Sequence, residues 1–91
     1  MPLFSTQLTN ETPSESFSAK GVETFLFASG TFDGGSMVAQ VSYDNSTWFS
    51  DSNLTFSSDS FETLRLSPTL WIRFVMESTD TASPDVEVVI T

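Results

Sequence analysis

Residues 70–77 read LWIRFVME, and this stretch decides the class of fold. Every second side chain from Leu70 to Met76 is apolar, while the residues between them include Arg73, and Glu77 follows. Successive side chains of a β-strand point to opposite faces of the sheet, so an apolar period of two is typical of a strand with one face in a core. An amphipathic helix would repeat its apolar residues every three or four positions. Residues 70–77 therefore predict a half-buried strand.

Similar segments follow one another at short spacing along the chain. The predicted strands comprise residues 22–29 (VETFLFAS), 37–43 (MVAQVSY), 47–50, 54–56, 61–66, 70–77 and 86–91 (VEVVIT). Turn-forming residues separate them, for example Gly30, residues 33–35 (DGG) and residues 44–46 (DNS). No window has the period of a helix longer than one turn. We therefore expect an all-β domain over residues 16–91, an antiparallel β-sandwich of six to eight strands with jelly-roll or Greek-key connections.

The alternation also assigns side chains to a core. We expect this core to contain either Phe25 or Phe27, together with Val41, Trp48, Leu64, Ile72, Phe74 and Val88. Trp71 shares its face of the strand with Arg73 and Glu77, so an exposed Trp71 would mark a contact surface. Arg65 and Arg73 are expected to pair with glutamates on neighbouring strands.

Residues 1–15 (MPLFSTQLTNETPSE) have no period and are expected to form an extended N-terminal arm outside the sandwich. Ordering such a segment costs about 1–2 kcal/mol of backbone entropy per residue, which one small domain cannot repay. We therefore expect the arm to be mobile in the isolated chain and ordered against a neighbouring subunit or a capsid. The candidate partner-binding residues are Leu3, Phe4, Leu8 and Trp71.

The composition argues against catalysis. The 91 residues include no His and no Cys, so the usual general base near neutral pH and the thiolate ligands of zinc are both missing. Serines are abundant, but a base for them would have to be Lys20, the single lysine. We expect a protein that is not an enzyme and carries no cofactor.

The charge restricts the partners. Twelve acidic residues stand against three basic ones, a net charge of −9, whereas affinity for nucleic acid comes from Lys and Arg. No apolar run approaches the roughly 20 residues that span a bilayer. We expect neither nucleic acid nor membrane as a partner. The N-terminus lacks the features of a signal peptide, so we expect synthesis in the cytoplasm. A domain this small gains stability by oligomerising, so copies of the chain are expected partners.

Two other ligand classes are weighed against simpler explanations. Asp44, Asn45, Asp51 and Asn53 offer oxygen ligands for calcium, but Asp and Asn are also the residues that make turns, and we expect no metal. Trp48 and Trp71 could form a platform on which sugar rings stack. A carbohydrate-binding or adhesin-type module is therefore the alternative function.

Residues 30–74 carry a resemblance to a known group of proteins. Their skeleton is a Gly-aromatic turn, then Gly34-Gly35 and an alternating strand, then residues 42–48 (SYDNSTW), and later residues 71–73 (WIR). This pattern resembles small β-sandwich proteins of tailed-phage virions, over about residues 20–91. Asn45 stands where the pattern usually has Gly, and Trp71 stands where it usually has Tyr.

The resemblance implies a structural role in a virion. The expected function is that of a head decoration (cement) protein, which binds the major capsid protein on the outer surface of the head and stabilises it. A homotrimer is the oligomer that the resemblance favours, and a tail or head-fibre subunit is a further alternative. The expected location is the capsid surface.

Overall fold

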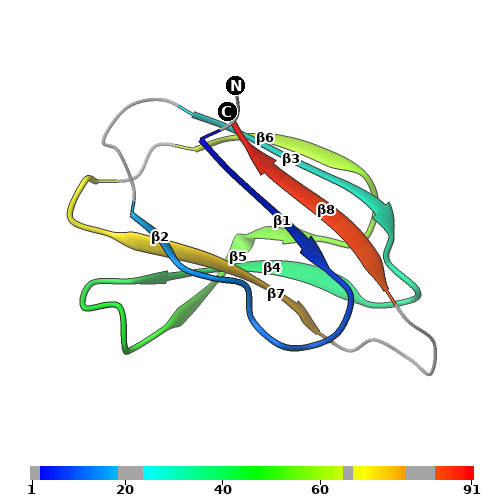
Figure 1. Cartoon of the computed structure of the whole chain (residues 1–91), viewed down its shortest axis with the longest axis horizontal. Coiled ribbons are helices and arrows are strands. Elements are labelled where there is room, and N and C mark those ends of the chain that lie inside the picture. The colour runs from blue at the N-terminus through cyan, green and yellow to red at the C-terminus, as the bar shows by residue number, and fades with distance from the viewer. Residues whose placement is uncertain (1–2, 19–23, 65–66, 78–83) are drawn as a thin grey trace.

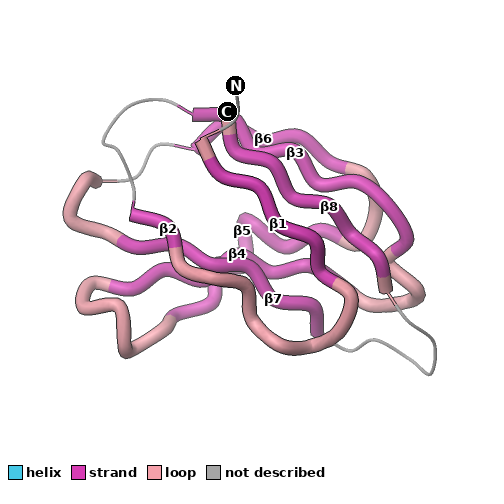
Figure 2. Tube along the Cα trace, in the orientation of Figure 1, coloured by secondary structure: helices cyan, strands magenta, loops and turns pink. Residues whose placement is uncertain are grey.

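The structure, a computed structural model, describes residues 3–18, 24–64, 67–77 and 84–91. These residues form eight strands and no helix (Figure 2), in two antiparallel sheets of four strands that lie face to face (Figure 1). Sheet A contains, in spatial order, β1 (Phe4–Leu8), β8 (Asp85–Ile90), β3 (Thr24–Thr31) and β6 (Ser60–Leu64). Sheet B contains β2 (Phe17–Ser18), β7 (Trp71–Glu77), β4 (Ser36–Ser42) and β5 (Phe49–Phe56). The predicted all-β sandwich of six to eight strands is confirmed.

The strand order is that of a jelly roll, which is one long hairpin rolled into two sheets. Going inward from the ends of the chain, β1 pairs with β8, β2 with β7, β3 with β6 and β4 with β5, always antiparallel. Two further pairings, β3 with β8 and β4 with β7, join these hairpin sections side by side in each sheet. Each described strand of the first half of the chain therefore pairs with strands of the second half.

The partner residues share a common midpoint in the sequence. The pair Phe4–Ile90 is centred on residue 47, and the pair Thr24–Leu64 is centred on residue 44. The turn between β4 and β5 occupies this position, and it contains Asn45 in the left-handed region with a φ of 61°. Asn adopts that region more readily than most residues other than Gly, so it fits the turn.

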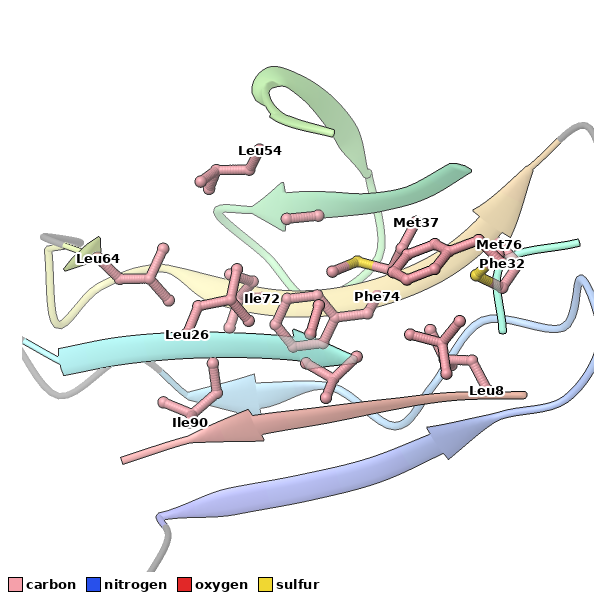
Figure 3. Close-up of a cluster of buried hydrophobic side chains, with 14 residues drawn as sticks. Leu8, Leu26, Phe32, Met37, Leu54, Leu64, Ile72, Phe74, Met76 and Ile90 are labelled. Carbon is pink, nitrogen blue, oxygen red and sulfur yellow. The ribbon is translucent and has the colours of Figure 1, made fainter. Parts of the chain in front are cut away.

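The core lies between the two sheets. Phe74 of β7 is completely buried, and Figure 3 shows its ring between β7 and the strands of sheet A. The predicted core residues Leu64, Ile72, Phe74 and Val88 are all buried, which confirms the inward faces of their strands. The buried cluster is completed by Leu8, Leu26, Ala28, Phe32, Met37, Ala39, Leu54, Met76, Val86 and Ile90.

Three expectations for the core are corrected. Strand β3 turns Leu26 and Ala28 inward, so Phe25 and Phe27 both lie on the outer face of sheet A. Trp48 is half-buried and lies outside the core cluster, against Arg73. Val41 is only partly buried, although it packs against the core.

Strand β3 also runs through Gly30, which was expected to separate two strands. Gly30 pairs with Val86 and has a φ of 134°, a backbone conformation that side chains disfavour. A Cβ at this position would collide with the backbone carbonyl of Asp85. The Gly30 N–H donates to the Asp59 carboxylate at 3.0 Å, which ties β3 to the turn before β6.

The expected arm is corrected as well. Residues 4–8 do not extend away from the domain but form β1, the edge strand of sheet A, paired with β8. Its inward side chains Phe4 and Leu8 pack in or against the core. Ser14 continues this attachment, because its N–H donates to the Phe74 carbonyl and its hydroxyl accepts from the Phe74 N–H. Residues 4–8 and Ser14, which were expected to be ordered by a partner, are hydrogen-bonded within the chain.

This difference can be measured with two matched truncations of leucine. Leu8→Ala removes a side chain that is 3% exposed and should lower the free energy of unfolding by about 2–5 kcal/mol. Leu3→Ala alters a side chain that is 48% exposed and should change it by less than about 0.5 kcal/mol. Urea denaturation of both variants is the measurement. If Leu8→Ala is as stable as the unmodified protein, residues 1–15 are a mobile arm and β1 does not contribute to the core.

Candidate functional site

Exposed aromatic side chains are the features of this molecule best suited to binding. The described residues contain no group of three or more acidic side chains that could hold a metal ion. Within the same residues no helix is long and apolar enough to cross a membrane. Five large aromatic side chains in the described part of the chain are exposed, and they fall into two separate groups, one associated with each sheet.

The first group, which we call the Phe face, consists of Phe25, Phe27 and Phe61 on the outer face of sheet A. Their side chains are 37%, 42% and 57% exposed. The rings of Phe25 and Phe61 are stacked with centroids 5.9 Å apart, and those of Phe27 and Phe61 are tilted at 5.1 Å. Large contiguous apolar patches on soluble proteins are commonly contact surfaces, which makes these three adjoining rings a candidate for one.

The register of sheet A assembles the Phe face. Phe27 of β3 lies opposite Phe61 of β6 and, on its other side, opposite Val89 of β8, which is half-buried. Further along β8 the same outer face carries Glu87 and Asp85. The Phe face is therefore apolar at its centre and acidic on one side.

The second group lies at the turn between β4 and β5, which we call the hairpin tip (residues 43–49). Tyr43 and Phe49 are 65% and 54% exposed, and their rings are stacked with centroids 6.4 Å apart and an interplanar angle of 29°. Figure 1 shows this turn, in green at the lower left, on the sheet opposite to β3 and β6. The two aromatic groups thus belong to different layers of the sandwich.

The Asp44 carboxylate organises the hairpin tip. Its Oδ1 accepts hydrogen bonds from the backbone N–H groups of Ser46 (2.9 Å) and Thr47 (2.7 Å) and from the Ser42 hydroxyl (2.9 Å). Its Oδ2 accepts from the Thr47 hydroxyl at 3.3 Å. The backbone donors at Thr47 and Ser46 lower the pKa of Asp44 from 3.8 to about 2.

Arg73 fills the outer face of sheet B beside the hairpin tip. Its guanidinium carbon lies 4.3 Å from the centre of the Trp48 ring, and its Nε–H donates to the Gln40 side-chain oxygen at 2.7 Å. Burial lowers the pKa of Arg73 below its usual value. The described residues give Arg73 an aromatic and an amide partner in place of the expected glutamate. Arg65, like Lys20, lies outside the described residues.

The structure separates the four residues that the sequence assigned to partner binding. Leu3 is exposed beside the end of β8, but Leu8 is in the core and is unavailable to a partner. Phe4 is half-buried and packs its ring against Phe74 at 6.2 Å, and also against Phe17. Trp71 is half-buried on the other sheet. These side chains do not form one surface, and none of them belongs to the Phe face, which the alternation pattern did not predict.

Asp44 and Asp51, two of the calcium candidates, accept hydrogen bonds from backbone N–H groups of their own turns. The Asp44 oxygens are occupied as described above, and the Asp51 Oδ1 accepts from the Asn53 N–H at 2.9 Å. Asp and Asn side chains that bond the backbone two residues further on are typical of turns.

The low pKa of Asp44 predicts a pH-dependent stability. Because the folded-state pKa of about 2 lies below the unfolded value of 3.8, the stabilisation from Asp44 is complete above about pH 4 and is lost as the pH falls toward 2. Asp44→Asn should lower the melting temperature at pH 6, and its difference from the unmodified protein should shrink between pH 4 and pH 2. Glu77→Gln, an exposed carboxylate on β7, is the control. A difference that stays constant down to pH 2 would contradict this role.

Comparison with protein families, with curated proteins and with solved structures finds no match to this chain. The two aromatic surfaces are therefore the observations that bear on function.

Proposed function

We propose that this protein is a non-enzymatic structural protein of a tailed-phage virion, a decoration protein that binds the major capsid protein through the Phe face. The observation that carries the proposal is the cluster of three exposed Phe rings on the outer face of sheet A. The resemblance of residues 30–74 to virion β-sandwich proteins is the reason for proposing a phage virion as the assembly that this protein joins. A jelly roll occurs among viral capsid proteins and lectins, which is compatible with this role but does not select it.

The Phe face has the properties of the centre of an interface. Full burial of a Phe side chain contributes about 1.5–3 kcal/mol, so covering the exposed part of each ring would contribute about 1 kcal/mol. Aromatic residues are enriched in the cores of interfaces, where a few side chains provide most of the binding energy. The rings of the Phe face already pack against one another, so little side-chain entropy is lost on binding.

The charge of the chain indicates the chemistry of the partner. Asp85 and Glu87 lie on the same outer face, and the whole chain carries a net charge of −9. A capsid surface with an apolar recess bordered by Lys and Arg would match both features. Two copies meeting through this face would bring their acidic strands together, so we favour the capsid over self-association here. The expected homotrimer would then use other surfaces.

The test is co-sedimentation of the purified protein with phage heads. The double variant Phe27→Ser/Phe61→Ser should lose most of its binding, about tenfold or more, because covering the two rings contributes at least about 1.4 kcal/mol together. The control is Tyr43→Ser, a more exposed aromatic in the turn after β4 of the other sheet, which should bind normally. The double variant also loses the cross-strand pair of Phe27 and Phe61, so its melting temperature should fall modestly, and binding is compared at a temperature at which all variants are folded.

Two results would contradict the proposal. Normal co-sedimentation of the double variant would show that the Phe face is not the contact. Sedimentation equilibrium provides the other check: self-association of the unmodified protein that the double variant abolishes would show that the face joins copies of this chain.

A further inference from the structure

We propose that the hairpin tip is a binding site for a neutral oligosaccharide, with sugar rings stacked on Tyr43 and Phe49. This site is independent of the Phe face, and its argument does not use the proposed function. Three properties of the tip support it: two exposed neighbouring rings, a turn held by side-chain hydrogen bonds, and neutral hydrogen-bonding groups around them.

The rings present stacking surfaces to solvent. Tyr43 and Phe49 are among the most exposed large side chains of the described residues, and their planes diverge by only 29°. Their centroids are 6.4 Å apart and the side chains are 65% and 54% exposed, so both rings keep aromatic surface open to solvent at one place. The C–H groups on the face of a pyranose ring pack on such a surface, and Tyr adds a hydroxyl at its rim.

The backbone of the tip is held in place before any ligand arrives. Asp44 ties the turn together through the donors of Ser42, Ser46 and Thr47, and Asn45 closes it in the left-handed region. Trp48 at the base of the tip is stacked under Arg73. A binding site on a rigid element loses little conformational entropy when it is occupied, so a few contacts suffice for measurable affinity.

The polar groups at the tip select a neutral ligand. Asn45 and Ser46 are exposed, and their side chains make no hydrogen bond within the described residues, so an amide and a hydroxyl remain for sugar hydroxyls. The nearest charges are already engaged: Asp44 by its own turn, and Arg73 by Trp48 and Gln40. A phosphate would find only Arg73, whose guanidinium already covers the Trp48 ring and bonds Gln40, and the exposed Asp44 carboxylate would repel it.

The position of the tip leaves it accessible while the Phe face is covered. The tip belongs to sheet B, and the Phe face is the outer surface of sheet A (Figure 1). A protein attached through sheet A would therefore still present the tip to a polysaccharide.

The test is titration of the full chain with cellohexaose, maltohexaose, chitohexaose and laminarihexaose. Binding is measured by calorimetry and by Trp fluorescence. Trp48 adjoins Phe49, so binding at the tip should change its emission. Tyr43→Ser and Phe49→Ser should each weaken the best ligand up to about tenfold, since loss of one aromatic stacking contact costs about 0.5–1.5 kcal/mol. Tyr43→Phe keeps the ring and should retain most of the affinity.

The matched control is Phe61→Ser, which removes an exposed ring from the other sheet and should leave sugar binding unchanged. Absence of binding to all four sugars at 10 mM would overturn the proposal. Tyr43→Ser and Phe49→Ser variants that bind as tightly as the unmodified protein would also overturn it. Self-association that disappears in Tyr43→Ser would identify the tip as a contact between copies, which also overturns it. Failure of capsid binding in the Phe-face variants would leave this result untouched.

Discussion

The antiparallel pairing of the first half of the chain with the second half is the constraint on which the structure depends. Each hairpin section supports the next, from β4–β5 beside the turn to β1–β8 at the two ends of the chain. Closing the outermost section joins Phe4 to Ile90, so the core is complete only when nearly the whole chain is paired. Such non-local pairing carries the entropy of closing long loops, which makes β-sandwiches slow to fold.

The sequence predicts the parts of this fold that have a local signal. Residues 70–77 alternate cleanly, so the strand and the burial of Ile72 and Phe74 follow from the pattern alone. Strand β1 has only a weak period, and its partner lies at the other end of the chain, so residues 1–15 resembled a free arm. Strand β2 has two residues, too few for any pattern. Tertiary pairing, which a local pattern does not contain, decides these elements.

The candidate site was harder to predict than the fold because binding surfaces break the rule that places apolar groups inside. Residues 22–29 (VETFLFAS) are apolar on both faces, so their period could not decide between Phe27 and Leu26 as the inward residue. The structure turns the smaller side chains inward and leaves the Phe rings outside. An apolar excess on both faces of one strand was the available signal for a contact surface, and it was read as a core.

Amide hydrogen exchange of the isolated monomer, resolved by residue, tests the rolled hairpin most directly. If β1 closes sheet A within one chain, the hydrogen-bonded amides of β1 and their partners on β8 exchange slowly, with protection well above that of the exposed turn at residues 57–59. If residues 4–8 are an arm that needs a partner, their amides exchange as fast as that turn while β3, β4 and β7 stay protected. That second pattern would contradict the account.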